Sequence, residues 1–393
     1  MKMLSLVILA GGRGTRLKKI SKGVPKPLIK ISGRPFIENI INHYSKYNFN
    51  KIYILSGYKS YLFKKYHNKF FNSIKVEIIQ EKEALGTGGA LSLLKTKIKN
   101  DFIFVNGDTF FNFNVNILIK NIDNKNIAHI ALVKNLNYKT NQKLNGLALN
   151  KKKEIFLNKN SKLMNGGAIY IKKEFLKYVK KKFCSLENDI LAKFIEKQLV
   201  GGTCFNNFFI DIGTPDNFFF AKKNLKKILS KKAVFLDRDG VINYDLGHVY
   251  KYNDFRFRKG VIKALKYLGE KNYYIFVITN QAGIAKGIYT LDQYLELNKK
   301  IKSYLSKKNI FFDTVEFCPH HIDAKIKKYK KICNFRKPGN LMIESIFKKW
   351  HVERHGSFMI GDKKSDFLAA KKSKLSFHYV QNNLYNQIKN IIK

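Results

Sequence analysis

Short apolar runs, each followed by small or polar residues, alternate along the chain with segments whose apolar positions recur at helical spacing. Runs of this length indicate buried strands, and the segments between them indicate helices. The predicted strands are Leu6–Ala10, Lys51–Ser56, Asp101–Val105, Val234–Leu236, Tyr274–Ile278 and Phe358–Ile360. The predicted helices include Pro35–Tyr47 and Lys259–Gly269. This alternation predicts an α/β fold, in which ligands bind beyond the carboxyl ends of the strands. The residues after each run are therefore candidate site residues.

The length of the chain predicts more than one domain. A chain of 393 residues is too long for one ordinary core. Apolar and basic residues alternate at helical spacing over Phe218–Lys232, without Gly or Pro. This pattern predicts a connecting helix, and a helix lying on a membrane surface is the alternative. We therefore predict two doubly wound α/β domains, residues 1–225 and 233–393, joined by a connecting helix at residues 226–232.

The formal charge of +47, from 75 Lys and Arg against 28 Asp and Glu, changes this picture little. The basic residues are spread over the predicted helix faces and do not form one block that alternates with aromatic residues. We therefore expect anionic small molecules as partners and no nucleic acid. Four cysteines in this length predict a reducing cytoplasm rather than a disulfide scaffold. No apolar run approaches the roughly 18 residues of a membrane helix, so we expect no membrane partner.

Candidate chemistry begins after the first predicted strand, in the glycine-rich turn Gly11–Leu17. Glycines let the backbone approach a phosphate closely, and successive N–H groups can form an anion nest. Arg13 and Arg16 add charge-assisted donors for a polyphosphate. Lys26 follows in a turn that has proline on both sides, and Asp108, at a strand end, is a typical magnesium ligand. For the glycines alone, a plain strand-to-helix turn is the alternative.

Six motifs occur in order over residues 1 to about 225: LAGGRGTRL, PKPL, LGTGGA, VNGD, NGGAIYI and DIGTP. In this order they resemble the sugar-phosphate nucleotidyltransferase family, which has a Rossmann-like fold. The resemblance implies that an oxygen of a sugar 1-phosphate attacks the α-phosphorus of a nucleoside triphosphate and that pyrophosphate leaves. It assigns charge neutralisation at the reacting phosphorus to Lys26. It assigns phosphate binding to Gly11, Gly12, Arg13, Gly14, Thr15 and Arg16.

The same resemblance assigns the rest of the first site. Base and ribose contacts fall to Gln80, Gly86 and Thr87, magnesium to Asp108 and Asp211, and substrate to Lys159 and Asn165. Of these, Lys159 is the residue expected at the sugar phosphate. The family has an acid before that lysine, and here the residue is Asn158. This departure leaves recognition of the sugar hydroxyls open.

The C-terminal half carries a second ordered set of strand-end residues. Asp237 and Asp239 follow an apolar run one residue apart, and alternate residues of a strand point the same way. With Thr279, Lys337 and Asp362 they resemble the haloacid dehalogenase-type phosphohydrolases over residues 233 to about 385. The resemblance implies that Asp237 attacks phosphorus and that Asp239 is the general acid and base. Thr279 and Lys337 would clamp the transferring oxygens. Magnesium is assigned to Asp237, to Asp239 through its backbone carbonyl and to Asp362, with Asp366 as a supporting residue.

Three further motifs, TNQAGIAKGIYT, CPHH and CNFRKPG, resemble the heptose-bisphosphate and histidinol-phosphate phosphatases within that family. They assign substrate contacts to Asn280, Arg336 and Lys363. That subgroup binds a structural zinc through one His and three Cys. Cys318, His320 and Cys333 match, whereas Phe335 stands in place of the last cysteine. A tetrahedral site needs four ligands, so we predict no tight zinc site unless His321 is the fourth ligand.

Together the two resemblances predict a bifunctional enzyme that makes an activated heptose for a surface polysaccharide such as lipopolysaccharide. The phosphatase would remove the 7-phosphate of D-glycero-D-manno-heptose 1,7-bisphosphate. The transferase, which looks most like the heptose-1-phosphate guanylyltransferases, would add GMP from GTP, with Mg²⁺ in both domains. Two alternatives stay open: a mannose or glucose 1-phosphate transferase with a histidinol-phosphate-type phosphatase, and a non-enzymatic basic scaffold or nucleic-acid binder that keeps both folds. The sequence leaves the oligomeric state unknown.

Overall fold

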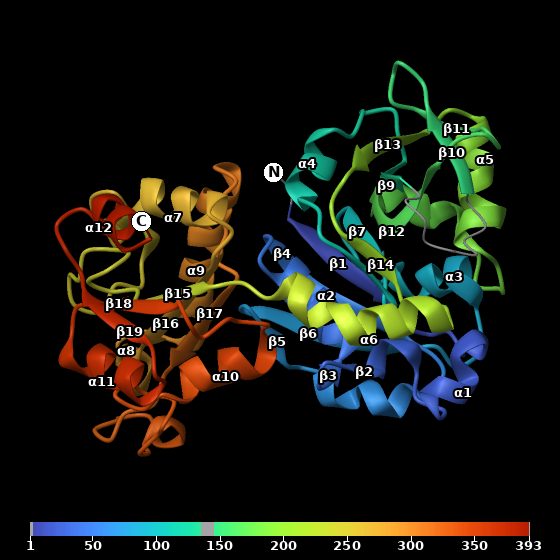
Figure 1. The fold of residues 1–393 in the computed structure, drawn as a ribbon. Helices are drawn as coiled ribbons and strands as arrows, with labels where there is room; N and C mark the ends of the chain where they lie inside the picture. The colour runs from blue at the N-terminus through green and yellow to red at the C-terminus, as the bar shows by residue number, and fades with distance from the viewer. Residues whose placement is uncertain (1–2, 135–144, 393) are drawn as a thin grey trace. The chain divides into compact units, whose positions relative to one another are not determined.

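The computed structural model describes residues 3–134 and 145–392, except for the side chains of Thr15, Lys18, Lys19 and Asn145. The chain folds into two compact units, and the main division between them falls between Leu225 and Lys226 (Figure 1). Each unit has its own main sheet with helices beside it, which is an α/β architecture. Each unit is described by itself below.

The first unit is built on a mixed sheet, which has ten strands in the described part of the chain. Four parallel strands form its centre in the order β7, β1, β4, β6, and β12 pairs antiparallel to β7. The strands are β1 Leu4–Leu9, β4 Phe49–Ser56, β5 Phe70–Phe71, β6 Ile74–Gln80, β7 Phe102–Asn106, β9 Ala128–Lys134, β10 Asn145–Leu149, β11 Ile155–Leu157, β12 Leu163–Ile171 and β13 Val200–Phe205. Two short antiparallel pairs accompany the sheet: β2 Lys30–Ile31 with β3 Arg34–Pro35, and β8 Thr109–Phe111 with β14 Phe209–Asp211.

Short helices connect these strands, and one longer helix ends the unit. They are α1 Lys18–Ser21, α2 Phe36–Ser45, α3 Gly86–Gly89, α4 Val115–Lys120, α5 Ala192–Glu196 and α6 Pro215–Leu229. A π-helical turn over Leu186–Leu191 leads directly into α5. The sheet is buried because apolar side chains of the central strands, such as Val7 and Leu55, belong to one core cluster with Leu91 and Ile169. Rigid central strands therefore carry the loops that follow their carboxyl ends.

The second unit has a sheet of five parallel strands in the order β17, β16, β15, β18, β19. The strands are β15 Ala233–Leu236, β16 Tyr274–Asn280, β17 Thr314–Cys318, β18 Phe358–Gly361 and β19 Ser376–Tyr379. The helices are α7 Val261–Glu270, α8 Ala282–Ala285, α9 Leu291–Lys307, α10 Leu341–Lys349, α11 Lys364–Lys372 and α12 Leu384–Ile391. This order places β15, with its two acids, in the middle of the sheet.

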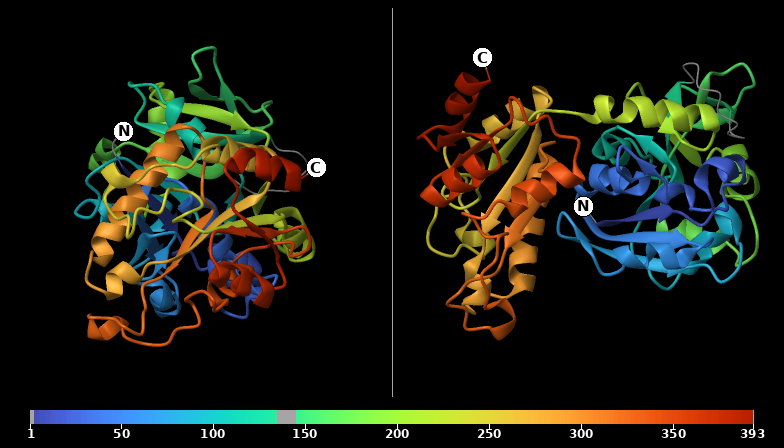
Figure 2. Two further views of the ribbon diagram at one scale, coloured as in Figure 1. Left: turned by 90° about the vertical axis from the view of Figure 1, so that its left-hand side faces the viewer. Right: turned by 60° about the horizontal axis from the view of Figure 1, so that its bottom comes forward.

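Helices cover both faces of this parallel sheet (Figure 2). Val234 and Leu236 of β15 belong to a core cluster that includes residues of α7, α9 and α12. Phe235, between them, belongs to a second cluster with residues of α10 and α11. A strand that is buried on both faces reads as a continuous apolar run, which is the pattern seen in the sequence. The predicted α/β class is confirmed.

The end of the first unit differs in detail from the predicted connecting helix. α6 begins at Pro215, so residues 226–229 are its last turn and residues 230–232 lie beyond it. Proline suits the first turn of a helix because its missing N–H would have no partner there, which explains the earlier start. None of the helices in the described ranges combines the length and the apolar character needed to cross a lipid bilayer.

Candidate active sites

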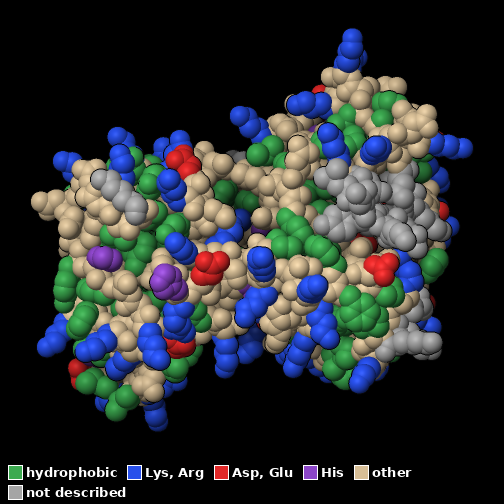
Figure 3. All heavy atoms as spheres, in the orientation of Figure 1, with side chains coloured by type: hydrophobic (Ala, Val, Ile, Leu, Met, Phe, Trp, Pro, Cys, Tyr) green, Lys and Arg blue, Asp and Glu red, His purple; other side chains and the backbone are tan. Residues whose placement is uncertain are grey.

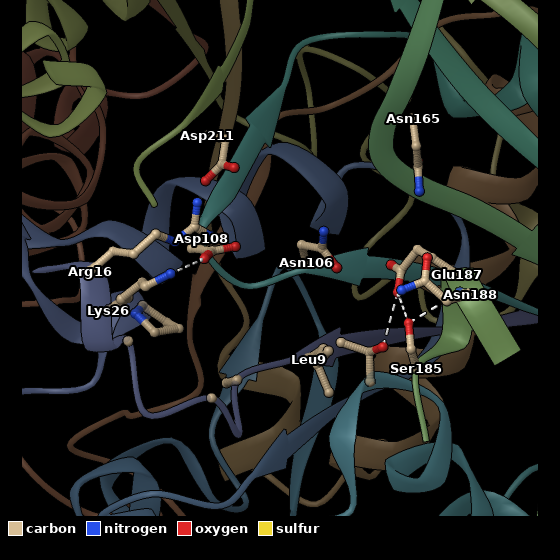
Figure 4. Close-up of a pocket in the computed structure, with 15 residues that line it drawn as sticks. Leu9, Arg16, Lys26, Asn106, Asp108, Asn165, Ser185, Glu187, Asn188 and Asp211 are labelled. Atoms are coloured by element: carbon tan, nitrogen blue, oxygen red, sulfur yellow. Dashed lines mark hydrogen bonds and ion pairs between the residues drawn. The ribbon is translucent and has the colours of Figure 1, made fainter. Parts of the chain in front are cut away.

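The first site lies where the glycine-rich turn follows β1. The parallel strands β1 and β7 end side by side, with Leu9 paired to Asn106, so the loops after them meet at one edge of the sheet. A cavity of about 300 Å³ opens at this edge. The predicted site residues that line it are Gly12, Gly14, Arg16, Lys26, Thr87, Asp108, Asn165 and Asp211 (Figure 4). The structure therefore brings together residues that are almost 200 positions apart in the sequence.

Two carboxylates and a lysine converge in this cavity. β8 and β14 pair antiparallel with Asp211 opposite Thr109, and the N–H of Ile212 donates to the carbonyl of Asp108 at 2.9 Å. Asp108, just before β8, and Asp211, the last residue of β14, are thereby held close together (Figure 4). Lys26 Nζ lies 3.2 Å from Asp108 Oδ2. Paired carboxylate oxygens are the donors that Mg²⁺ prefers, so the residues present fit a divalent cation.

A second cavity, of about 590 Å³, adjoins the first and shares Leu9, Gly12 and Thr87 with it. Its lining includes Gly11, Arg13 and Gly86, which were predicted for phosphate or base binding, and also Glu81. Glu81 is buried at 8% exposure, and burial raises the pKa of its carboxyl above the ordinary value. An acid in such an enclosed position marks this cavity as a candidate site for a ligand that donates hydrogen bonds.

Two predicted residues, Gln80 and Lys159, are not brought into these cavities. Gln80 is the last residue of β6 and is exposed, and the residue after it, Glu81, lines the second cavity instead. The chain turns inward there because the N–H of Glu81 donates to Ser56 O at 2.8 Å. Lys159 is exposed in the turn after β11 and lines neither cavity. The side chain of Thr15 lies outside the described residues.

A set of polar residues that the sequence motifs did not identify also lines the first cavity. Ser185, Glu187 and Asn188 come from the π-helical turn and its first flanking residue (Figure 4). Thr87 Oγ1 donates to Glu187 Oε2 at 3.0 Å and accepts from the N–H of Leu186 at 2.8 Å. Ser185 Oγ accepts from the N–H of Asn188 at 3.1 Å. A serine followed by acids is a sequence signal for a helix start, and it could have located this turn but not its place in the cavity.

The second site lies at the carboxyl end of β15, in the second unit. Asp237 is buried and its Oδ2 lies 2.8 Å from Lys337 Nζ, which is also 2.6 Å from Asp366 Oδ1. Lys337 is 3% exposed and donates to the carbonyl of Ile278 at 3.0 Å. Burial raises the pKa of Asp237 to about 7, while the charge of Lys337 opposes that rise. A buried carboxylate beside a fixed cation can attack an electrophile and hold the anion that forms.

Three neighbours hold the carboxylate of Asp239. The guanidinium of Arg238 donates to both its carboxylate oxygens at 2.8–3.1 Å. Asn243 Nδ2 donates to Oδ1 at 3.0 Å, and Gln281 Nε2 donates to Oδ2 at 2.9 Å. These contacts fix the side chain of Asp239 two residues after Asp237. Its predicted metal contact through the backbone carbonyl stays a prediction.

Three acids of the second site gather closely enough to share a cation. One carboxylate oxygen each of Asp237, Asp362 and Asp366 lies within 4.8 Å of the others. Asp362 Oδ1 is buried and has no hydrogen-bond partner among the described residues, and burial raises the pKa of Asp362. The backbone approaches closely here, because Gly240 has φ +87° and a Cβ at that position would lie 2.3 Å from Asp362 Oδ2. These hard oxygen donors fit Mg²⁺.

The remaining predicted residues surround this centre. Thr279 is buried at the end of β16 and accepts from Gln281 Nε2 at 2.9 Å. Asn280 and Lys337 exchange two hydrogen bonds of 3.0 Å through the backbone of Lys337, which fixes the lysine loop beside β16. Lys363 is exposed and its Nζ lies 3.0 Å from Asp245 Oδ2. Arg336 is half-buried in the loop before Lys337.

The cysteine loop offers three metal donors rather than four. One donor atom each of Cys318, His320 and Cys333 lies within 4.8 Å of the others. His321 is not part of this group, and its Nδ1 accepts from the N–H of Asp323 at 3.1 Å. Phe335 is 37% exposed and offers no donor. The residues present do not fit a closed tetrahedral zinc site.

Comparison with known proteins divides the chain in the same way. A family model described as nucleotidyl transferase matches residues 5–228, and one described as polynucleotide kinase 3 phosphatase matches residues 235–384. The D-glycero-beta-D-manno-heptose-1,7-bisphosphate 7-phosphatase of Photorhabdus laumondii is 42% identical over 143 residues, which cover 36% of this chain and 76% of that protein. The phosphatase of the same name from Rhodopseudomonas palustris is 40% identical over 141 residues, covering 36% and 78%. Among solved structures, HddC from Yersinia pseudotuberculosis complexed with GMP-PN is 29% identical with a TM-score of 0.49, covering 57% of this chain and 100% of that one.

The first family match extends over the first unit, and the second falls within the second unit. The predicted fusion of a nucleotidyltransferase with a phosphatase is thereby confirmed. Both matches are to families of enzymes, which supports the predicted enzyme. The chain belongs to the nucleotidyl transferase family through residues 5–228 and, through its C-terminal domain, to the family of the D-glycero-beta-D-manno-heptose-1,7-bisphosphate 7-phosphatases.

Proposed function

We propose that this enzyme catalyses two consecutive steps in the synthesis of a nucleotide-activated heptose. The C-terminal domain removes the 7-phosphate of D-glycero-D-manno-heptose 1,7-bisphosphate, and the N-terminal domain transfers GMP from GTP to the resulting heptose 1-phosphate. The contact that carries the proposal is the buried Asp237–Lys337 pair beside Asp362. The names of the relatives at 37–42% identity support heptose bisphosphate as the substrate.

In the phosphatase step, a carboxylate oxygen of Asp237 attacks phosphorus and the sugar oxygen leaves, which forms an aspartyl-phosphate. Asp239 donates a proton to the departing oxygen and later accepts one from the water that cleaves the intermediate. Asp239 must give up one of its present hydrogen bonds to reach the substrate, and Gln281 and Asn243 are its neutral partners. Lys337 neutralises the charge on the transferring oxygens, and the hydroxyl of Thr279 donates a hydrogen bond to them. Asp237 and Asp362 would hold Mg²⁺, which supplies further positive charge at the phosphoryl group.

In the nucleotidyl step, an oxygen of the sugar 1-phosphate attacks the α-phosphorus of the nucleotide, and pyrophosphate leaves on the opposite side. Such a transfer depends on positioning and charge neutralisation more than on covalent help. The N–H groups of the glycine-rich turn and the side chain of Arg16 bind the phosphates. Lys26 neutralises the α-phosphoryl group, for which it must release Asp108. Asp108 and Asp211 would hold Mg²⁺ at the same phosphates.

The proposal is tested by supplying heptose 1,7-bisphosphate to the full-length enzyme with Mg²⁺ and each nucleoside triphosphate in turn. We expect phosphate release without nucleotide, and pyrophosphate release only when GTP is also present. Heptose 1-phosphate, mannose 1-phosphate and glucose 1-phosphate are compared as acceptors, and histidinol phosphate as an alternative phosphatase substrate. Faster turnover of histidinol phosphate together with a hexose 1-phosphate would overturn the proposal in favour of the alternative enzyme pair.

A further inference from the structure

We propose that Gln281 is a positioning residue of the phosphatase, which holds Asp239 and Thr279 through one side-chain amide. The inference rests on the proposed phosphatase step and adds a residue that acts through two groups of the site. Gln281 Nε2 donates to Asp239 Oδ2 at 2.9 Å and to Thr279 Oγ1 at 2.9 Å. An amide nitrogen has two hydrogens, and both are used here. The general acid and the hydroxyl that binds the phosphoryl group are therefore held by the same side chain.

The backbone and the burial of Gln281 fix the place of this amide. Gln281 follows β16 directly, and its N–H donates to the carbonyl of Cys318 on the neighbouring strand β17 at 2.8 Å. Gln281 is 2% exposed and Thr279 is 1% exposed, so water has little access to the hydrogen bond between them. A buried amide or hydroxyl without a partner is destabilising, so these hydrogen bonds determine how the two side chains lie.

Tyr289 fixes the orientation of the amide from its other end. The hydroxyl of Tyr289 donates to Gln281 Oε1 at 2.5 Å. Burial raises the pKa of Tyr289 to about 12, so the hydroxyl keeps its proton at neutral pH. A reversed amide would place Oε1 against the ionised carboxylate of Asp239, where neither group has a hydrogen to donate. The nitrogen of Gln281 therefore faces Asp239, and the oxygen faces Tyr289.

The turn after β16 makes room for the ring of Tyr289. A Cβ at Gly283 would lie 2.1 Å from Tyr289 Cε1, so a side chain at this position would displace the ring. The ring also stacks on that of Tyr250, with a centroid distance of 5.0 Å and an interplanar angle of 13°. Tyr289 is 3% exposed. These contacts hold the ring in place, and with it the hydroxyl that orients Gln281.

This hydrogen-bond pattern gives Gln281 two effects on the reaction. Thr279 Oγ1 accepts from Gln281, so the hydroxyl proton of Thr279 stays available for an oxygen of the transferring phosphoryl group. Gln281 also holds one carboxylate oxygen of Asp239, which limits the positions from which Asp239 can deliver a proton to the departing oxygen. Every phosphate ester needs the first effect. Only an ester with a strongly basic leaving group, such as a sugar alkoxide, needs the second.

The test compares heptose 1,7-bisphosphate with p-nitrophenyl phosphate as substrates of the full-length enzyme with Mg²⁺. p-Nitrophenolate leaves as a stable anion without a proton, and kcat/KM reports the steps up to formation of the aspartyl-phosphate. Gln281→Met keeps the size of the side chain and removes its donors. It should lower kcat/KM for the bisphosphate by about 10- to 100-fold, and the ratio of this value to that for p-nitrophenyl phosphate by about 10-fold. Retained turnover of the aryl ester shows that the second unit is still folded.

Tyr289→Phe removes only the hydroxyl that orients the amide. It should lower the same ratio by about 2- to 5-fold, because Gln281 keeps its donors but loses the partner of its oxygen. Added to Gln281→Met, it should cause no further loss of the ratio, because Tyr289 acts through Gln281. Additive losses in the double variant would overturn the inference.

A matched control makes the same substitution away from the site. Gln387 of α12 is also buried, and its Nε2 donates to Tyr379 O at 2.7 Å. Gln387→Met should therefore leave the ratio of the two substrates unchanged. Equal losses on both substrates in Gln281→Met would overturn the inference, because they would show no effect on proton delivery. Absence of phosphate release from the bisphosphate in the wild-type enzyme would instead contradict the proposed function.

Discussion

The charged residues of the phosphatase site depend on one another, because Lys337 forms ion pairs with both Asp237 and Asp366. Asp366 is fully buried, and it accepts the N–H groups of Asp362 at 3.2 Å and Lys363 at 3.0 Å in addition to its ion pair. It therefore fixes the lysine, while Asp237 keeps one oxygen for Lys337 and one for the N–H of Arg238 at 2.7 Å. Although burial opposes a charged lysine, the two aspartates raise the pKa of Lys337. Lys337 is thus positively charged whenever Asp237 is ionised.

Asp237→Asn is expected to abolish phosphatase activity, by on the order of 10³-fold or more in kcat. Asparagine keeps the size of the side chain and its acceptor for the N–H of Arg238, but it cannot form the phosphorylated intermediate. Phosphate release from the bisphosphate measures the loss. Asp254→Asn, the same change at an exposed acid of the second unit, should retain activity. Substantial activity in Asp237→Asn would show that another group attacks phosphorus.

The pH dependence of the phosphatase should move with the concentration of Mg²⁺. Asp237 attacks only when ionised, and burial raises its pKa to about 7 in the absence of metal. A cation binds the ionised form, so it lowers this pKa, and the acidic limb of the kcat/KM profile should shift to lower pH as Mg²⁺ increases. Profiles at several Mg²⁺ concentrations test this, corrected for the titration of the substrate phosphate. An acidic limb at the same pH throughout would contradict the assignment of Asp237 to the metal.

The sequence was sufficient to predict which residues form a site where those residues come directly after a predicted strand. Asp237, Lys337 and Asp362 meet as expected because each is attached to a parallel strand or the loop beside it. Glu81 could not be found in this way, because its position depends on Gly11 and Gly57, which are distant in sequence and adjacent only in the fold. The hydrogen bonds of Asp239 could not be predicted either, because their donors include Gln281, which comes close to Asp239 only in the folded chain.

At the scale of elements, predictions succeeded where a strand is buried on both faces and failed where an element is held mainly by its neighbour. The π-helical turn Leu186–Leu191 follows a basic, exposed stretch with little apolar periodicity. It is fixed to α3 instead: Gly88 N–H donates to Cys184 O at 2.9 Å, and Cys184 N–H donates to Leu85 O at 3.0 Å. Such backbone contacts carry no signature in a sequence. The side of the first cavity that this turn forms could therefore be located only from the structure.

Thr87→Val should show whether Thr87 holds the π-helical turn in place or binds the nucleotide directly. The hydroxyl of Thr87 bonds both Glu187 and the N–H of Leu186, and valine has the same shape without it. Leaving these partners unpaired should destabilise the first unit by about 1–3 kcal/mol, measured from its urea midpoint, and raise the KM for nucleotide. Thr87→Ser should restore most of both. An unchanged midpoint with a raised KM would indicate that Thr87 binds the nucleotide directly.

At the scale of the whole molecule, the positive charge is distributed rather than gathered at one site. Figure 3 shows Lys and Arg side chains over the visible face of both units. A field of this kind attracts anionic substrates of either step without choosing between them. Selection between the substrates must therefore come from the two sites. Each site has its own aspartates and its own lysine. Because none of the residues assigned to one site belongs to the other unit, we expect the two activities to respond independently to substitution.

Arg16→Ala tests this independence from the transferase side. Arg16 lines the first cavity, and loss of its charge-assisted hydrogen bonds to phosphate should lower kcat/KM for the nucleotide by about 10- to 100-fold. Phosphate release from heptose 1,7-bisphosphate should stay unchanged, and Asp237→Asn should transfer GMP normally when heptose 1-phosphate is supplied. Arg16→Lys keeps the charge but loses the planar fork, so its activity should be intermediate. If either substitution reduced both activities equally, the sites would depend on one another, because no shared residue could explain a joint loss.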